Sequence, residues 1–223
     1  MAGKENGSKN ALSIVSFVLG PVQTNTYLVA DPATTDAVVI DPAWSGEVIV
    51  EEASRRGWQI RGIWLTHAHF DHFGGAAAVA AASGAPVALH PEDLPLWRAA
   101  GGAAAFGFQA FDPGSEPSLW LSHGMKLRIG SHSLEVRHTP GHSPGHVIFT
   151  SHRAGLVFSG DLIFMAGVGR DDLPGGDWRQ LMTSIASEIL TLPDDTRLLS
   201  GHGPETTVGR ERRSNPFIMG GII

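Results

Sequence analysis

The sequence has no cysteine and no block of basic residues. Without cysteine there can be no disulfide and no thiolate metal ligand, which is compatible with a reducing compartment. The formal net charge is −6, so binding to nucleic acid or to an anionic membrane surface is not expected. No apolar run approaches the length that spans a bilayer. Short-period repeats and low-complexity segments are also missing. These absences indicate a globular protein without a nucleic-acid or membrane partner.

The length fits one large domain or two small ones, and 42% of the 223 residues are hydrophobic, enough for a sizeable core. We expect a flexible polar tail at residues 1–10 and a single domain at residues 11–223. Two lysines precede the apolar run 11–20, as in a short secretory signal. However, Ser13 and Ser16 interrupt that run, and no small-residue cleavage motif follows it. We therefore expect a cytoplasmic protein.

Apolar periodicity and turn residues predict a chain of alternating strand and helix groups. The expected strands are residues 14–19, 26–30, 36–40, 60–65, 86–90, 126–129, 133–138, 147–150, 156–159 and 197–200. The expected helices are residues 45–56, 74–83 and 177–190, with a short helix near Trp97 and a helical piece that ends near Pro216. Each half of the chain is a run of strands followed by helices, which is not the strict alternation of a doubly wound parallel sheet. Two mixed sheets packed together, with helices outside, fit this order better.

The segment from Thr66 to His72 concentrates three imidazoles and one carboxylate directly after an apolar strand. Neutral imidazole and carboxylate oxygen are ligands suited to zinc, manganese and iron. The glycines and alanines that follow predict a helix start, so the segment lies on a strand-to-helix turn where several side chains can point at one centre. The alternative is a solvated loop that is merely rich in histidine.

Three further polar signals each follow an apolar strand and are braced by glycine or proline. They are His142 in Pro-Gly-His, Asp161 in Gly-Asp and His202 in Gly-His-Gly. Strand ends that line up on one edge of a sandwich would bring these signals next to the histidine segment. The combined set is His67, His69, Asp71, His72, His142, Asp161 and His202. Five imidazoles and two carboxylates exceed what one tetrahedral ion uses, so the sequence predicts two adjacent metal ions.

In this order the motifs H-x-H-x-D-H, P-G-H, G-D and G-H-G resemble the metallo-β-lactamase superfamily. Within it, the chain is most similar to the small glyoxalase II-type (hydroxyacylglutathione hydrolase-type) hydrolases, and the likeness covers nearly all residues beyond the tail. The resemblance implies an α+β fold, an αββα four-layer sandwich of two mixed β-sheets flanked by helices. It also implies a ligand set: His67, His69 and His142 for the first metal, Asp71, His72 and His202 for the second, and Asp161 as the bridging carboxylate.

The resemblance implies a binuclear metal-dependent hydrolase that cleaves a small thioester, such as a hydroxyacyl-glutathione conjugate. Two divalent ions, with zinc as the first choice and iron or manganese as alternatives, would hold a bridging hydroxide that attacks the carbonyl carbon. A thiolate leaving group needs less protonation than an amine. Asp161 is expected to be catalytic as the shared ligand. From its position, Asp71 is the side chain best suited to orient the water or accept its proton.

Three residues outside the ligand set are candidates for supporting roles. Asp41, expected to be extended at a strand tip before proline, is predicted to orient a ligand imidazole, with capping of the next turn as the alternative. His146 lies one tight turn from His142 and is a candidate for contact with the metal ligands. Arg170 resembles the cation that holds a glutathione carboxylate in glyoxalase II enzymes. The alternative for Arg170 is a surface ion pair with Asp171 or Asp172.

The sequence departs from glyoxalase II enzymes in two respects, which leaves glutathione specificity open. Asp172 stands where an aromatic residue is typical, and the C-terminal helical domain that supplies further glutathione contacts is not expected after His202. Persulfide dioxygenases share the fold and a Gly-Arg-x-Asp segment but use one iron. A mononuclear iron persulfide dioxygenase is therefore the main alternative, ahead of a β-lactamase, and a non-enzymatic metal-held scaffold ranks last. The irregular apolar segment 91–117 is expected to cover the site or to pack against a neighbouring chain, which leaves a homo-oligomer open; the alternative is a surface loop without such a role.

Overall fold

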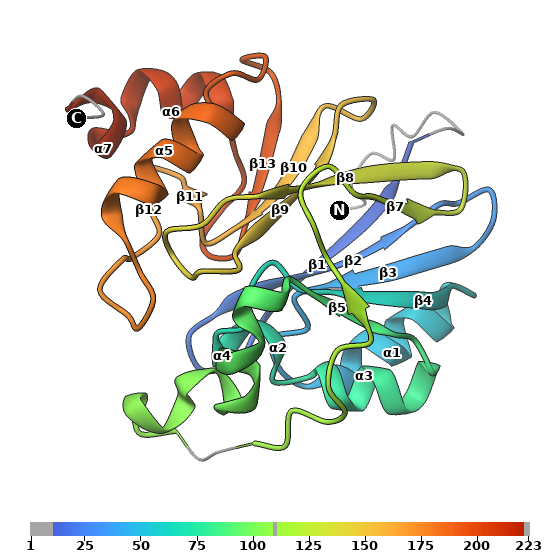
Figure 1. Ribbon diagram of the computed structural model, residues 1–223. Coiled ribbons are helices and arrows are strands. Elements are labelled where there is room, and N and C mark those ends of the chain that lie inside the picture. Colours follow the sequence, from blue (N-terminus) through green and yellow to red (C-terminus); the bar gives the residue numbers. More distant parts are fainter. Residues whose placement is uncertain (1–10, 109–110, 221–223) are drawn as a thin grey trace.

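The computed structural model describes residues 11–108 and 111–220, so the expected tail at residues 1–10 lies outside the described residues. Two six-stranded sheets pack face to face, and helices cover the outer face of each sheet (Figure 1). This arrangement is the αββα sandwich of two mixed sheets that the sequence predicts. Within the two described ranges, none of the helices is long and apolar enough to cross a membrane.

The first sheet has the strand order β1-β2-β3-β4-β5-β6. Its strands are β1 (Ser13–Leu19), β2 (Thr24–Ala30), β3 (Asp36–Ile40), β4 (Gln59–Trp64), β5 (Val87–Leu89) and β6 (Leu119–Trp120). The first three strands pair antiparallel, and the pairs from β3 to β6 are parallel. A parallel pair requires a crossover, and helices supply it after β3 and β4. Because β3, β4 and β5 run parallel to one another, the loops that follow them emerge at the same edge of the sheet.

The second sheet has the strand order β14-β13-β10-β9-β8-β7. Its strands are β7 (Lys126–Ile129), β8 (His132–His138), β9 (Val147–Ser151), β10 (Leu156–Gly160), β13 (Arg197–Ser200) and β14 (Thr206–Thr207). Only the pair of β10 and β13 is parallel. A small hairpin of β11 (Ile163–Phe164) and β12 (Gly167–Val168) follows β10.

The helices divide between the two outer faces (Figure 1). On the first sheet lie α1 (Gly46–Arg55), α2 (Phe70–Phe73), α3 (Ala76–Ser83) and α4 (Leu94–Arg98), with the 3₁₀ helices η1 (Pro91–Asp93) and η2 (Ala100–Phe106). On the second lie α5 (Trp178–Glu188), α6 (Val208–Ser214) and α7 (Pro216–Met219). Apolar side chains fill three layers, one beneath each set of helices and one between the sheets.

Strand β2 shows how one sequence serves two apolar layers. Successive side chains of a strand point to opposite faces of its sheet. Leu28 belongs to the layer beneath α1, α3 and α4, whereas Tyr27 and Val29 belong to the layer between the sheets. There the Tyr27 ring meets the Phe158 ring of β10 at a centroid distance of 5.1 Å. Burial on both faces explains why the central strands read as nearly continuous apolar runs.

The predicted strands agree with the structure within two residues at each end, and the differences elsewhere have local causes. The helix predicted from residue 74 begins at Ala76, because residues 70–73 form the separate helix α2. A Cβ at the intervening Gly74 would lie 2.6 Å from the carbonyl oxygen of Ala43, so this close approach requires glycine. Ser45, expected to cap α1, is left-handed with φ 47° and makes no capping hydrogen bond. The two-residue strands were missed because they are too short to show alternation.

Candidate metal centre

All seven predicted ligand residues meet at one edge of the sandwich, at the ends of strands from both sheets. His67 and His69 follow β4, and Asp71 and His72 lie on α2. The others follow strands of the second sheet: His142 lies in the turn after β8, Asp161 follows β10 and His202 follows β13. Two backbone hydrogen bonds each join a strand of one sheet to a ligand loop of the other here: Val147 N of β9 donates to Thr66 O at 2.8 Å, and Asn25 N of β2 donates to Gly201 O at 2.7 Å. The predicted convergence of strand ends is therefore present.

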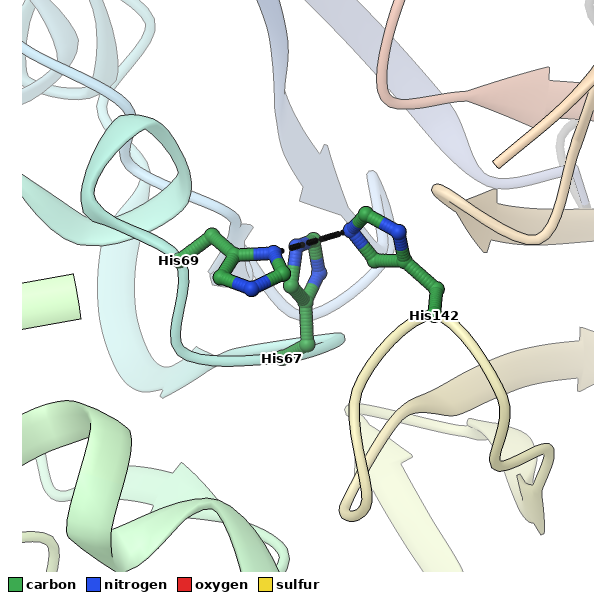
Figure 2. A group of neighbouring side chains, drawn as sticks. All are labelled: His67, His69 and His142. Atoms are coloured by element: carbon green, nitrogen blue, oxygen red, sulfur yellow. Dashed lines mark hydrogen bonds between the residues drawn. The ribbon is translucent and has the colours of Figure 1, made fainter. Parts of the chain in front are cut away.

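His67, His69 and His142 form a first cluster in which three imidazoles from two loops face one another (Figure 2). The Nε2 atom of His142 lies 2.9 Å from His69 Nδ1 and 3.1 Å from His67 Nε2. On its far side, His142 Nδ1 lies 2.7 Å from the carbonyl oxygen of Arg170 and must donate to it. That bond fixes the tautomer, so His142 Nε2 carries a lone pair.

A similar chain fixes the tautomer of His67. The hydroxyl of Thr66 donates to Asp41 Oδ2 at 2.6 Å. Its oxygen is then free to accept from His67 Nδ1 at 3.0 Å, which leaves a lone pair on His67 Nε2. Buried lone pairs that point at one another repel unless a cation lies between them. The first cluster therefore has the donor chemistry of a metal site.

Asp71, His72 and His202 form the second cluster. His202 Nε2 lies 3.2 Å from Asp71 Oδ2. His72 Nδ1 lies 2.9 Å from Asp41 Oδ2 and donates to that carboxylate. The opposite nitrogen, His72 Nε2, is buried without a hydrogen-bond partner and lies 3.5 Å from Asp71 Oδ2 and 3.3 Å from Asp161 Oδ1. Burial acts to lower the pKa of His72, but the carboxylates of Asp161, Asp71 and Asp41 outweigh it and raise that pKa well above its ordinary value. A proton therefore occupies the position at which this nitrogen would bind a metal ion.

Asp161 lies between the clusters. Its Oδ1 atom is 3.3 Å from His72 Nε2, and its Oδ2 atom is 3.5 Å from both His142 Nε2 and His202 Nε2. Zinc–ligand bonds of about 2.0–2.1 Å in a tetrahedral site place ligand atoms roughly 3.3 Å apart. The separations in both clusters lie near this value, so the residues present fit two divalent ions that share Asp161.

The electrostatics differ between the clusters. Burial and the neighbouring His142 lower the pKa of His69 to about 3, and burial with His72 and His142 holds the pKa of His67 well below its ordinary value. These imidazoles are therefore neutral, as metal ligands must be. Burial acts to lower the pKa of His202, but hydrogen bonds to Asp161 and Asp71 outweigh it and raise the pKa to about 10. Without metal, protons compensate the carboxylates of the second cluster.

Asp41 contacts a predicted ligand imidazole, as expected, but its predicted extended backbone is wrong. Asp41 has φ 48°, in the left-handed region. Besides His72 Nδ1, its carboxylate accepts from the backbone nitrogen of Thr66 at 2.7 Å and from the Thr66 hydroxyl at 2.6 Å. Aspartate tolerates this conformation better than most residues, and three hydrogen bonds stabilise it here.

His146 contacts the main chain of a candidate ligand, Asp161. The ring is fully buried, and its Nε2 accepts from the backbone nitrogen of Asp161 at 3.1 Å. The other nitrogen, Nδ1, lies 2.8 Å from the Thr139 hydroxyl. His146 therefore fixes the main chain of the carboxylate that lies between the clusters. Two further contacts at the site are not evident from the sequence: Thr24 Oγ1 donates to Asp71 Oδ2 at 2.9 Å, and Asp93 accepts from Ala68 N and Gly145 N in the two ligand loops.

A cavity of about 230 Å³ opens onto the clusters. Besides five of the seven candidate ligands, it is lined by Val22, Phe70, Phe106, Phe108, Leu173 and Arg170. Arg170 Nε and Nη2 donate to Asp172 Oδ1 and Oδ2 at 2.6 and 2.8 Å. The structure thus contains the ion pair that the sequence offered as the alternative for Arg170, although the residue does line the cavity. Among the residues that the structure describes, the wall beyond the ligands is apolar apart from Arg170.

The comparisons with known proteins agree with this geometry. The family model described as the Metallo-beta-lactamase superfamily matches residues 19–202. The probable metallo-hydrolase YqgX of Bacillus subtilis is 40% identical over 205 residues, which cover 91% of this chain and 95% of that protein. Hydroxyacylglutathione hydrolase GloC of Haemophilus influenzae is 34% identical over 199 residues, which cover 88% of this chain and 93% of that protein.

Solved structures with the same fold agree with these sequence matches. The BLEG-1 B3 metallo-beta-lactamase superposes with a TM-score of 0.88 at 37% identity, covering 92% of this chain and 99% of that one. TTHA1623 in a di-iron-bound form superposes with a TM-score of 0.83 at 45% identity, covering 91% and 99%. ETHE1 from Myxococcus xanthus reaches 0.79 at 26% identity, covering 93% and 85%. With the family match, the relatives and the assembled motifs in agreement, the chain belongs to the metallo-beta-lactamase superfamily.

Proposed function

We propose that this metal-dependent hydrolase cleaves small thioesters, with hydroxyacyl-glutathione as the first substrate to test. The observation that carries the proposal is the pair of clusters that share Asp161 beside a mostly apolar cavity. Two divalent ions bound there would activate a water molecule and polarise the thioester carbonyl. Zinc is the first choice, and the di-iron form of TTHA1623 keeps iron as an alternative; manganese has the same preference for nitrogen and oxygen ligands.

The roles of the chain's own residues follow from their contacts. We assign His67, His69 and His142 to one ion, Asp71, His72 and His202 to the other, and Asp161 to both. Asp71 Oδ2 accepts from the Thr24 hydroxyl, and the Asp71 carboxylate lines the cavity. It is therefore the group that would orient the attacking water and accept its proton. A thiolate leaves without protonation, so no further acid is required.

The cavity wall supports a small substrate with apolar parts. Phe70 packs against Phe106 and Phe108 with ring centroids 5.4 and 4.9 Å away. These rings exclude water beside the carboxylates and contact alkyl groups of an acyl chain or thiol. Arg170 would hold a substrate carboxylate once it is released from Asp172. The relative GloC, whose name is hydroxyacylglutathione hydrolase, adds support for this substrate class.

A β-lactam is a less favoured candidate substrate, although the BLEG-1 B3 metallo-beta-lactamase has the same fold over 92% of this chain. Gly169 followed by Arg170 resembles the thioester and persulfide enzymes instead. Persulfide oxidation by a single iron is therefore the main alternative to thioester cleavage. It would need only part of the ligand set, whereas all seven residues converge.

One experiment separates these activities. The metal-loaded protein is supplied in turn with lactoyl-glutathione, a chromogenic cephalosporin and glutathione persulfide, while thiol release, ring opening and oxygen uptake are measured. We expect thiol release that is lost in metal-depleted protein and in Asp161→Ala. Ring opening or oxygen uptake without thiol release would contradict the proposal.

A further inference from the structure

Asp93 is a buried carboxylate that joins the two loops of the first cluster without contacting the reaction site itself. It is the last residue of η1 and is fully buried. Its Oδ2 atom accepts from the backbone nitrogen of Ala68 at 3.0 Å and from the Ser143 hydroxyl at 2.8 Å. Its Oδ1 atom accepts from the backbone nitrogen of Gly145 at 2.6 Å. Ala68 lies between His67 and His69, and Ser143 directly follows His142.

The helix η1 lies close to the loop that carries His142. A Cβ at Gly145 would lie 2.7 Å from the backbone nitrogen of Asp93 and 2.9 Å from its carboxylate. The same loop is held from outside by His138, whose Nε2 donates to the carbonyl oxygen of Pro144 at 2.8 Å. The loop therefore cannot shift relative to Asp93 without breaking several hydrogen bonds.

We propose that Asp93 is a positioning residue: its carboxylate sets the distance between the loop of His67 and His69 and the loop of His142, and so determines how tightly the first cluster binds its metal ion. The inference rests on the proposed assignment of these histidines to that ion. Three donors meet two carboxylate oxygens, so both oxygens must accept. An asparagine has the same size but only one acceptor oxygen, so its NH2 group would face an N–H or O–H donor without a hydrogen bond.

The chain offers a matched control in Asp31. This carboxylate is also buried, and it also accepts from two backbone nitrogens and one serine hydroxyl. The donors are Ala33 N at 2.8 Å, Ser131 N at 2.8 Å and Ser131 Oγ at 2.7 Å. Asp31 joins the turn after β2 to the hairpin of β7 and β8, and it contacts neither ligand loop. Asp31→Asn therefore disrupts the same kind of hydrogen bonds, but these bonds do not position a candidate metal ligand.

The experiment compares Asp93→Asn with Asp31→Asn in the full chain. The melting temperature of the metal-free protein, the metal content and the zinc affinity against a competing chelator are measured for each, and the visible spectrum is recorded after loading with cobalt. We expect both variants to lose similar stability. Only Asp93→Asn should lose affinity at the first cluster, about 10- to 100-fold as for other residues that orient metal ligands, with the cobalt spectrum changed.

Ser143→Ala provides a milder variant in case Asp93→Asn does not fold. It removes one donor and leaves Asp93 paired with Ala68 and Gly145, so a several-fold loss of affinity is expected. Wild-type affinity in Asp93→Asn, or in Ser143→Ala if only that variant folds, would overturn the proposal, and so would an equal loss of metal in Asp31→Asn. Because these measurements need no substrate, absence of thioester hydrolysis would contradict the proposed function and leave the role of Asp93 standing.

Discussion

Replacing Arg170 with alanine tests whether the cavity binds a carboxylate of the substrate. The Arg170 side chain is 51% exposed, and its guanidinium is already paired with Asp172. A hydrogen bond to a charged group contributes about 1.5–3 kcal/mol. Solvent exposure and competition from Asp172 favour the lower end of that range. A loss of about 1.5 kcal/mol corresponds to roughly a tenfold change in binding. We therefore expect Arg170→Ala to raise KM for lactoyl-glutathione about tenfold, with kcat little changed because ground-state and transition-state binding are lost together.

The assay compares KM and kcat for lactoyl-glutathione with those for an acyl-N-acetylcysteamine, which is a neutral thioester. Arg170→Lys should recover only part of the binding, since a point charge does not reproduce the two-pronged contact. Asp172→Asn should lower the KM for lactoyl-glutathione relative to the neutral thioester, because it frees the guanidinium. Arg98→Ala is the matched control. Arg98 makes the same exposed two-pronged pair, with Glu116 at 2.7 and 3.2 Å, and does not line the cavity. Equal losses on both thioesters, or none on either, would refute the reasoning.

Three further predictions concern the metal centre. Asp161→Ala removes the carboxylate that both clusters share, so metal content and hydrolysis should fall together by at least about 10–100-fold; full retention of two ions would show that Asp161 is only structural. Asp41→Asn should weaken metal binding at the second cluster about 10- to 100-fold through His72, and unchanged zinc affinity would contradict that. Finally, the raised pKa of His202, about 10, means that this imidazole is protonated in the metal-free protein at neutral pH. Metal must displace that proton, so calorimetry in buffers of different ionisation enthalpy should show proton release and an affinity that falls as the pH is lowered; binding without proton release would argue against His202 as a ligand.

The metal centre could be predicted from the sequence because its chemistry is local. Four residues of the ligand set lie within the six positions from His67 to His72, and each remaining ligand follows an apolar strand and is flanked by glycine or proline. Residue type determines which metals suit the site, and turn residues mark where strands end. The convergence of the seven side chains then requires only that these strand ends share one edge of the sandwich, which they do.

The supporting residues could be predicted less well, because their partners are distant in the chain. Asp93 reads in the sequence as an ordinary residue before a short helix, yet it accepts from Ala68, 25 positions away, and from Gly145, 52 positions away. Asp41 was expected to be extended because proline follows it. Its three hydrogen bonds instead hold it in the left-handed region.

By itself, the sequence determined the fold class, the family and the candidate ligands, because donor chemistry, strand periodicity and the order of motifs are properties of short segments. Only the tertiary structure decided which groups pair with one another. It placed His146 on the backbone of Asp161, Asp172 on the guanidinium of Arg170 and Asp93 between two loops. The reason is physical: a hydrogen bond requires atoms within about 3 Å, and packing of remote segments sets such distances.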